Sequence, residues 1–116
     1  MTSIKEDLTD TSINTLVKYA HQTAKDSGFH DRKRELGTSL MLIISELSEI
    51  LEADRKGILN EVNAKIPLIT NFEEELADVV IRIMDLAGEY KLNLSLALKF
   101  KMSYNKTREK KHGKRY

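Results

Sequence analysis

Two short acidic motifs, each inside an apolar stretch with helical spacing, are the most constraining feature of this chain. They are Glu46-Leu47-Ser48-Glu49 and Glu75-Leu76-Ala77-Asp78. A helix brings positions three residues apart onto one face, so each motif directs a pair of carboxylates to one side. If the two helices pack together, four acids meet at one place. At about 4 Å and an effective dielectric of about 20, each like-charged pair then costs roughly 4 kcal/mol.

A divalent cation held by the four carboxylates would remove this repulsion. Oxygen ligands suit Mg²⁺, or Mn²⁺ in its place, so the motifs predict a metal site formed by Glu46, Glu49, Glu75 and Asp78. Ordinary helices whose acids pair with Lys or Arg at the edge of a bundle give the same pattern, and the residues alone leave that alternative open. A di-iron bundle would place Glu-x-x-His on two helices, but the histidines stand elsewhere, at positions 21, 30 and 112.

Composition favours a single all-helical domain spanning residues 1–116. The chain of 116 residues is long enough for one core and contains one Pro and five Gly, with abundant Leu, Ile, Ala, Glu and Lys. Apolar spacing predicts four helices. Their expected ranges are from just after Asp10 or Thr11 to Gly28, from about Glu35 to Lys56, from an N-cap at Asn71 (with Glu74 as its capping-box partner) to about 88–92, and from Asn93 or Ser95 into the C-terminal segment.

The cysteine content and the N-terminus restrict the class of protein. Cys is absent, which excludes disulfides, thiolate zinc sites and a cysteine nucleophile. The N-terminal residues lack the apolar region of a signal peptide, and no apolar run approaches the roughly 18 residues of a transmembrane helix. The sequence therefore predicts a cytoplasmic protein with no membrane partner.

Charge is distributed unevenly along the chain. Residues 99–116 contain eight Lys or Arg and one Glu, a formal charge of +7, so the rest of the chain carries −6 because the whole chain carries +1. An acidic body with a basic C-terminal segment suits either an arm that binds nucleic acid or a set of phosphate ligands beside a metal. A merely solvated tail is a third interpretation.

Three segments match a known family pattern. They are SELSEILEA at 45–53, followed by RKG at 55–57; FEEELADVVIRIMDLA at 72–87; and KMSYNKTR at 101–108, followed by KHGK at 111–114. In this order they resemble the MazG-like, all-α nucleoside triphosphate pyrophosphohydrolases, and the resemblance covers about residues 20–116. Either acidic motif alone is weak evidence, whereas the three segments together are specific.

The resemblance implies Mg²⁺-dependent hydrolysis of a nucleoside triphosphate to the monophosphate and pyrophosphate. The implied fold is a four-helix bundle completed by oligomerisation, as a homodimer or homotetramer. The four acids become the metal ligands, and phosphate binding falls to Lys101, Asn105, Arg108 and Lys114. A carboxylate that is not fully engaged by metal would accept the proton of the attacking water, and Glu49 is the candidate for this catalytic role.

Two positions depart from the pattern of the family. Ser45 precedes Glu46 where many relatives have another Glu, which leaves the number of metal ions open. His30 stands where relatives often have Trp, and we interpret it as an exposed loop residue. His21 is interpreted as structural.

The alternative function is a non-catalytic helical module that binds nucleic acid or a protein partner through the basic C-terminal segment. Lys101 and Arg108 are seven residues apart, near two helical turns, with Asn105 between them on the same face. Beyond Phe100, the aromatic residues of this segment are Tyr104 and Tyr116, which are suited to stack on bases. This pattern favours a small phosphate ligand over nucleic acid.

Overall fold

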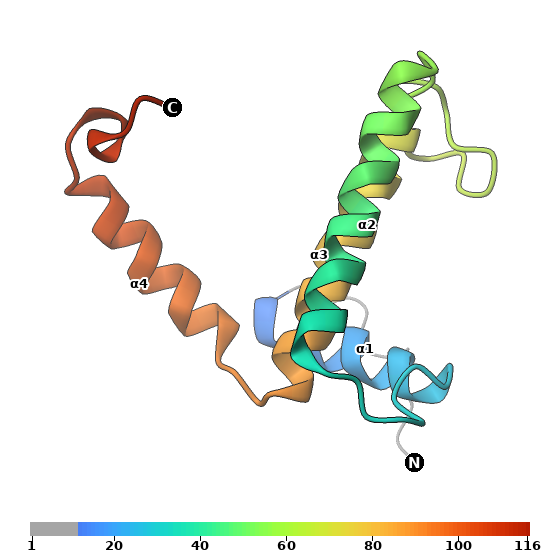
Figure 1. Cartoon of the computed structure of the whole chain (residues 1–116), viewed down its shortest axis with the longest axis horizontal. Helices are drawn as coiled ribbons and strands as arrows, with labels where there is room; N and C mark the ends of the chain where they lie inside the picture. Colours follow the sequence, from blue (N-terminus) through green and yellow to red (C-terminus); the bar gives the residue numbers. More distant parts are fainter. Residues whose placement is uncertain (1–11) are drawn as a thin grey trace.

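The computed structural model describes residues 12–116, and this part of the chain is helical apart from its connections (Figure 1). The helices are α1 (Ile13–Asp26), α2 (Leu36–Arg55), α3 (Asn71–Glu89), α4 (Leu94–Lys106) and the short 3-10 helix η2 (Lys110–Gly113). The expected all-α fold is confirmed. Residues 1–11, which include the expected start of the first helix at Asp10 or Thr11, lie outside the described residues.

The ends of the helices follow local rules, with one correction. Gly57 has a φ of +70° just after α2, which is the left-handed conformation that glycine adopts at low cost. The N-cap of α3 is Thr70, not Asn71 as predicted: the Thr70 hydroxyl accepts from the Glu73 N–H at 3.2 Å, and Glu73 Oε1 accepts from the Thr70 N–H at 2.9 Å. Asn71 instead donates from its side-chain amide to the Ile58 carbonyl at 2.8 Å, which ties down the loop before α3.

A small core forms where α1 crosses α3. Its buried members are Val17 and Ala20 from α1 and Met84 and Ala87 from α3. The two helices approach closely at Gly88, where an added Cβ would stand 2.6 Å from the Cβ of His21. Helix α2 lies along α3 on the other side, so α3 is the central element to which both neighbours attach (Figure 1).

Helix α4 leaves this assembly and extends away from the α2–α3 pair (Figure 1). Its first turn is held to α1 by Asn14, whose side chain donates to Asn93 Oδ1 at 3.0 Å and accepts from the Ser95 N–H at 3.1 Å. Asn93, one of the two predicted caps, caps α4 by accepting from the Leu96 N–H at 3.1 Å. Within the described residues, therefore, three helices pack together and the fourth diverges.

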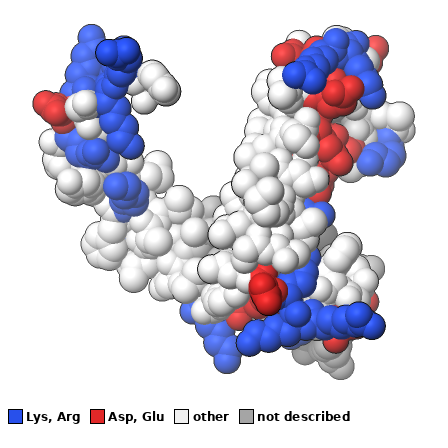
Figure 2. Space-filling view, viewed as in Figure 1, with Lys and Arg blue, Asp and Glu red and all other residues white. Residues whose placement is uncertain are grey.

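Large apolar side chains are exposed on every helix of the two diverging arms. They include Leu40, Ile44, Leu47 and Leu51 on α2, Leu76 and Val80 on α3, and Leu96, Phe100 and Met102 on α4. Figure 2 shows that the surface of the α2–α3 arm that faces α4 lacks charged side chains over much of its length. Across residues 12–116, no helix combines the length and the apolar character needed to cross a membrane.

Candidate metal centre

Three of the four predicted metal ligands meet between α2 and α3. Glu46 on α2 and Glu75 and Asp78 on α3 each offer a carboxylate oxygen, and these oxygens lie within 4.8 Å of one another. The spacing of three along α3 places both of its acids on the side that faces α2. We call Glu46, Glu75 and Asp78 the acidic group. Glu49 is exposed and is not one of these three, although it lies one turn further along α2.

Two carboxyls of the acidic group have raised pKa values. Burial, followed by the charge of Glu49, raises the pKa of the Glu75 carboxyl above its ordinary value. Burial, followed by the charge of Glu46, raises the pKa of the Asp78 carboxyl in the same way. Glu75 Oε2 is also buried without a hydrogen-bond partner among the residues that the structure describes. An oxygen in that position favours a cation at the site.

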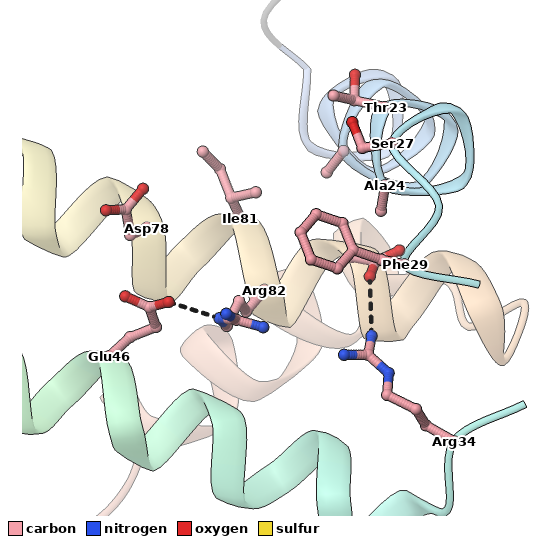
Figure 3. Close-up of a pocket in the computed structure, with 11 residues that line it drawn as sticks. Thr23, Ala24, Ser27, Phe29, Arg34, Glu46, Asp78, Ile81 and Arg82 are labelled. Atoms are coloured by element: carbon pink, nitrogen blue, oxygen red, sulfur yellow. Dashed lines mark hydrogen bonds and ion pairs between the residues drawn. The ribbon is translucent and has the colours of Figure 1, made fainter. Parts of the chain in front are cut away.

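Positive side chains reach the edge of the acidic group. Arg82 Nε donates to Glu46 Oε1 at 2.7 Å, across from α3 to α2 (Figure 3). Lys65 Nζ lies 3.1 Å from Glu74 Oε1, and its charge lowers the pKa of Asp78 against the larger effects that raise it. The alternative in which the acids form ordinary ion pairs therefore describes Glu46, whereas Glu75 and Asp78 keep raised pKa values.

The donor set of the acidic group fits a hard divalent cation. All three ligands are carboxylates, which suit Mg²⁺ or Mn²⁺ better than softer metals. A cation would also pair with the orphaned oxygen of Glu75 and remove the repulsion between Glu75 and Asp78. The remaining positions around a six-coordinate Mg²⁺ would be left for water or for a ligand such as phosphate.

A pocket of 230 Å³ opens beside the acidic group (Figure 3). Glu46, Asp78 and Arg82 line one end, and Phe29 and Ile81 give it an apolar wall. An apolar cavity with a few charged groups at one end is typical of sites for small organic ligands. Sequence reasoning missed Phe29 and Ile81 as lining residues because they come from two segments with no shared motif.

A second polar cluster occupies the same face of α3, closer to its C-terminal end. Asp85 is buried, and its Oδ1 contacts two imidazoles. It lies 2.8 Å from His21 Nδ1 and 2.8 Å from His30 Nε2. His30 Nδ1 lies 3.2 Å from Glu89 Oε2. The interpretation of His30 as an exposed loop residue is therefore wrong, because its side chain is only 13% exposed. Its partner Asp85 is 55 residues away in the sequence, so no local pattern revealed the pairing.

The predicted phosphate ligands lie on α4 and beyond it. Lys101 Nζ and Arg108 Cζ both lie near the ring of Tyr104, 5.0 and 5.6 Å from its centroid. Asn105 Oδ1 is buried without a hydrogen-bond partner among residues 12–116. Lys114 is exposed after η2. Figure 2 shows basic side chains at the far end of the α4 arm, away from the acids on the α2–α3 arm. One chain therefore does not bring its basic segment to its own acidic group.

Comparisons of this chain with protein-family models, with curated proteins and with solved structures found no match.

Proposed function

We propose that the protein is a Mg²⁺-dependent nucleotide pyrophosphohydrolase, which hydrolyses a nucleoside triphosphate to the monophosphate and pyrophosphate. The observation that carries the proposal is the acidic group: three carboxylates from two helices within 4.8 Å, with raised pKa values for two of them. The adjoining pocket of 230 Å³ offers the nucleoside an apolar wall next to those carboxylates. The family resemblance of the three sequence segments supports the same reaction.

In this proposal, Glu46, Glu75 and Asp78 hold the metal, and Glu49 stands one helical turn away. Mg²⁺, when bound, supplies charge neutralisation for the phosphate oxygens and acidifies a coordinated water. The oxygen of a water attacks the α-phosphorus, the bond from that phosphorus to the bridging oxygen breaks, and pyrophosphate leaves with the bond's electron pair. Glu49 takes the proton of the attacking water, since it is the acid of the two motifs that stands outside the acidic group.

The complete site requires a second copy of the chain in this proposal. The basic segment that contains Lys101 and Arg108 belongs to the α4 arm, whose basic side chains lie away from the acids of the α2–α3 arm (Figure 2). The apolar faces of α2 and α4 are exposed, and a second copy would bury them as a bundle is completed. A homodimer, or a homotetramer built from such dimers, would then place the basic segment of one subunit beside the acids of the other.

Activity is tested with a panel of common and modified nucleoside triphosphates, with diphosphates in the same panel, assayed for monophosphate and pyrophosphate in the presence of Mg²⁺. Asp78→Asn should lower the rate by about 100-fold or more, because metal charge supplies several kcal/mol in such reactions. Asp54→Asn, at an exposed position of α2 outside the acidic group, is the matched control and should retain the activity. Equal rates in the two variants, or no pyrophosphate from any substrate, would reject the enzyme.

Mixing two variants tests the shared site. Asp78→Asn damages the acids and Arg108→Ala the basic segment, and each variant alone should be weak at low substrate concentration. A mixed dimer would contain one intact site if the basic segment acts across the interface, so activity should return on mixing. Absence of recovery, with dimers present by light scattering, would place the basic segment outside the site.

The effect of Arg108→Ala separates phosphate binding from the alternative function. Loss of one charge-assisted contact to phosphate should raise KM about tenfold, which corresponds to ~1.4 kcal/mol. An unchanged KM combined with retention of DNA or RNA on a filter at low salt would instead favour the nucleic-acid module.

A further inference from the structure

We propose that His21, His30 and Asp85 form a second metal site, for a divalent transition cation of the Zn²⁺ class. The site is separate from the acidic group and does not depend on the pyrophosphohydrolase proposal. His21 lies on α1, His30 follows α1 in the connection to α2, and Asp85 lies on α3. One nitrogen from each imidazole and one oxygen of Asp85 lie within 4.8 Å of one another.

The ligand chemistry differs from that of the acidic group. Two imidazole nitrogens and one carboxylate form a mixed set that suits Zn²⁺ and other late divalent metals, whereas Mg²⁺ prefers oxygen alone. Three protein ligands leave a fourth position of a tetrahedral site open. Within the described residues, this is the place where two histidines and a carboxylate come together.

Both ring nitrogens of His30 face carboxylate oxygens, and a neutral imidazole cannot donate a hydrogen bond to both. Its Nε2 is 2.8 Å from Asp85 Oδ1, and its Nδ1 is 3.2 Å from Glu89 Oε2. A neutral imidazole carries one N–H, so one of these nitrogens would direct a lone pair at a carboxylate oxygen. A metal bound between His30 Nε2 and Asp85 resolves the conflict, since Nδ1 then keeps its proton and donates to Glu89.

Glu89 is placed to accept a hydrogen bond from a metal-bound His30 without binding the metal itself. A carboxylate that accepts from the second nitrogen of a metal-bound histidine fixes the tautomer and the orientation of the ring. The Asp85 carboxylate has a similar support, because Arg34 Nη2 lies 3.8 Å from its Oδ2. His21 Nδ1 and His30 Nε2 both contact Asp85 Oδ1, each at 2.8 Å.

The surrounding backbone brings the ligands together and leaves access for a cation. Gly88 allows α1 to approach α3, since a Cβ at that position would stand 2.6 Å from the Cβ of His21. A surface pocket of 530 Å³ is lined by His21, His30 and Glu89, so the imidazoles are reached from solvent. Metal binding would add a further link between α1, the connection that follows it and α3.

Zn²⁺ binding is measured on the full chain by competition with a colorimetric chelator, with Mg²⁺ in large excess to occupy the acidic group. We expect one Zn²⁺ per chain. His30→Asn should abolish that binding, and Glu89→Gln should weaken it by about tenfold or more, the usual effect of removing a carboxylate that orients a histidine ligand. His112→Asn is the matched control: it removes the exposed third histidine, and Asn tolerates the φ of +52° at that position.

Nitrogen NMR of the wild-type imidazoles decides the question even if His30→Asn fails to fold. Zn²⁺ should shift the signals of His21 and His30 and leave His112 unchanged, and Asp78→Asn should keep this response. Co²⁺ in place of Zn²⁺ should give visible absorption of a low-coordinate site. Unshifted signals of His21 and His30 with Zn²⁺ present, or equal Zn²⁺ affinity in His30→Asn and His112→Asn, would show that the cluster is an ion-pair network without a metal.

Discussion

Helix α3 carries two aspartates, seven residues apart, in opposite electrostatic surroundings. Asp85 is buried and lies against two imidazoles and a guanidinium. Asp78 lies among other carboxylates, and burial together with the charge of Glu46 raises its pKa. Removing one partner of a buried ion pair destabilises a fold, whereas removing one of several like charges relieves repulsion. The cluster around Asp85 thus ties α1 to α3, while we expect the acidic group to gain stability from an added cation.

Removal of the charge at Asp85 should cause the largest loss of stability. Asp85→Asn leaves His21, His30 and Arg34 facing a neutral amide in a buried place, and we expect the free energy of unfolding to fall by about 3 kcal/mol. Urea unfolding without divalent cations measures the change. Asp54→Asn, at an exposed position of α2, should stay within about 0.5 kcal/mol of wild type. Equal stability of the two variants would contradict a structural role for the cluster.

The close approach of α1 and α3 that forms the cluster can be tested separately with a glycine. Gly88→Ala would place its Cβ 2.6 Å from the Cβ of His21, so we expect a loss of about 1–3 kcal/mol from overpacking. Gly37→Ala is the matched control, because nothing lies within 4 Å of a Cβ built there. That variant should gain a few tenths of a kcal/mol from helix propensity, less than in a helix interior because Gly37 is the second residue of α2. Opposite signs in urea unfolding would confirm the contact, and a gain in both variants would refute it.

The sequence was sufficient where short-range chemistry decides the structure. Apolar spacing located the four helices, Gly57 marked the end of α2, and Asn93 marked the start of α4. The acidic motifs also led to Glu46, Glu75 and Asp78, because a spacing of three fixes which face of a helix an acid occupies. The N-cap of α3 was misplaced by one residue, since a tertiary contact to the Ile58 carbonyl uses the Asn71 side chain.

The sequence was insufficient where distant segments meet. His30 and Asp85 are 55 residues apart, and Glu46 and Arg82 are 36 apart, so neither pair leaves a local pattern. The direction of α4 depends on Asn14, a residue of α1 that hydrogen-bonds to the start of α4. The same limit applies to Glu49, whose helical spacing from Glu46 did not predict that it would remain exposed beside the acidic group.

The smallest expected effect has the opposite sign to that of Asp85→Asn. Without divalent cations at neutral pH, Asp78→Asn removes a repelled charge and should stabilise the protein by a few tenths of a kcal/mol, up to ~1 kcal/mol for a partly exposed group. A folded pKa above the unfolded one means that the charged form costs stability, and this cost disappears as the pH falls through the raised pKa towards the ordinary value of about 4. The stability difference between variant and wild type should therefore shrink on acidification.

Comparing the variant with wild type at each pH cancels the contributions of the groups that the two proteins share. Saturating Mg²⁺ should reverse the order at neutral pH, because a cation that binds only the folded wild type stabilises it in proportion to the logarithm of the cation concentration. Thermal unfolding of wild type and variant across this pH series, once with Mg²⁺ and once with a chelator, gives the four curves of stability against pH. If Asp78→Asn is destabilising without metal at every pH, the acidic group is an ion-paired part of the fold like the cluster around Asp85, and the contrast between the two aspartates fails.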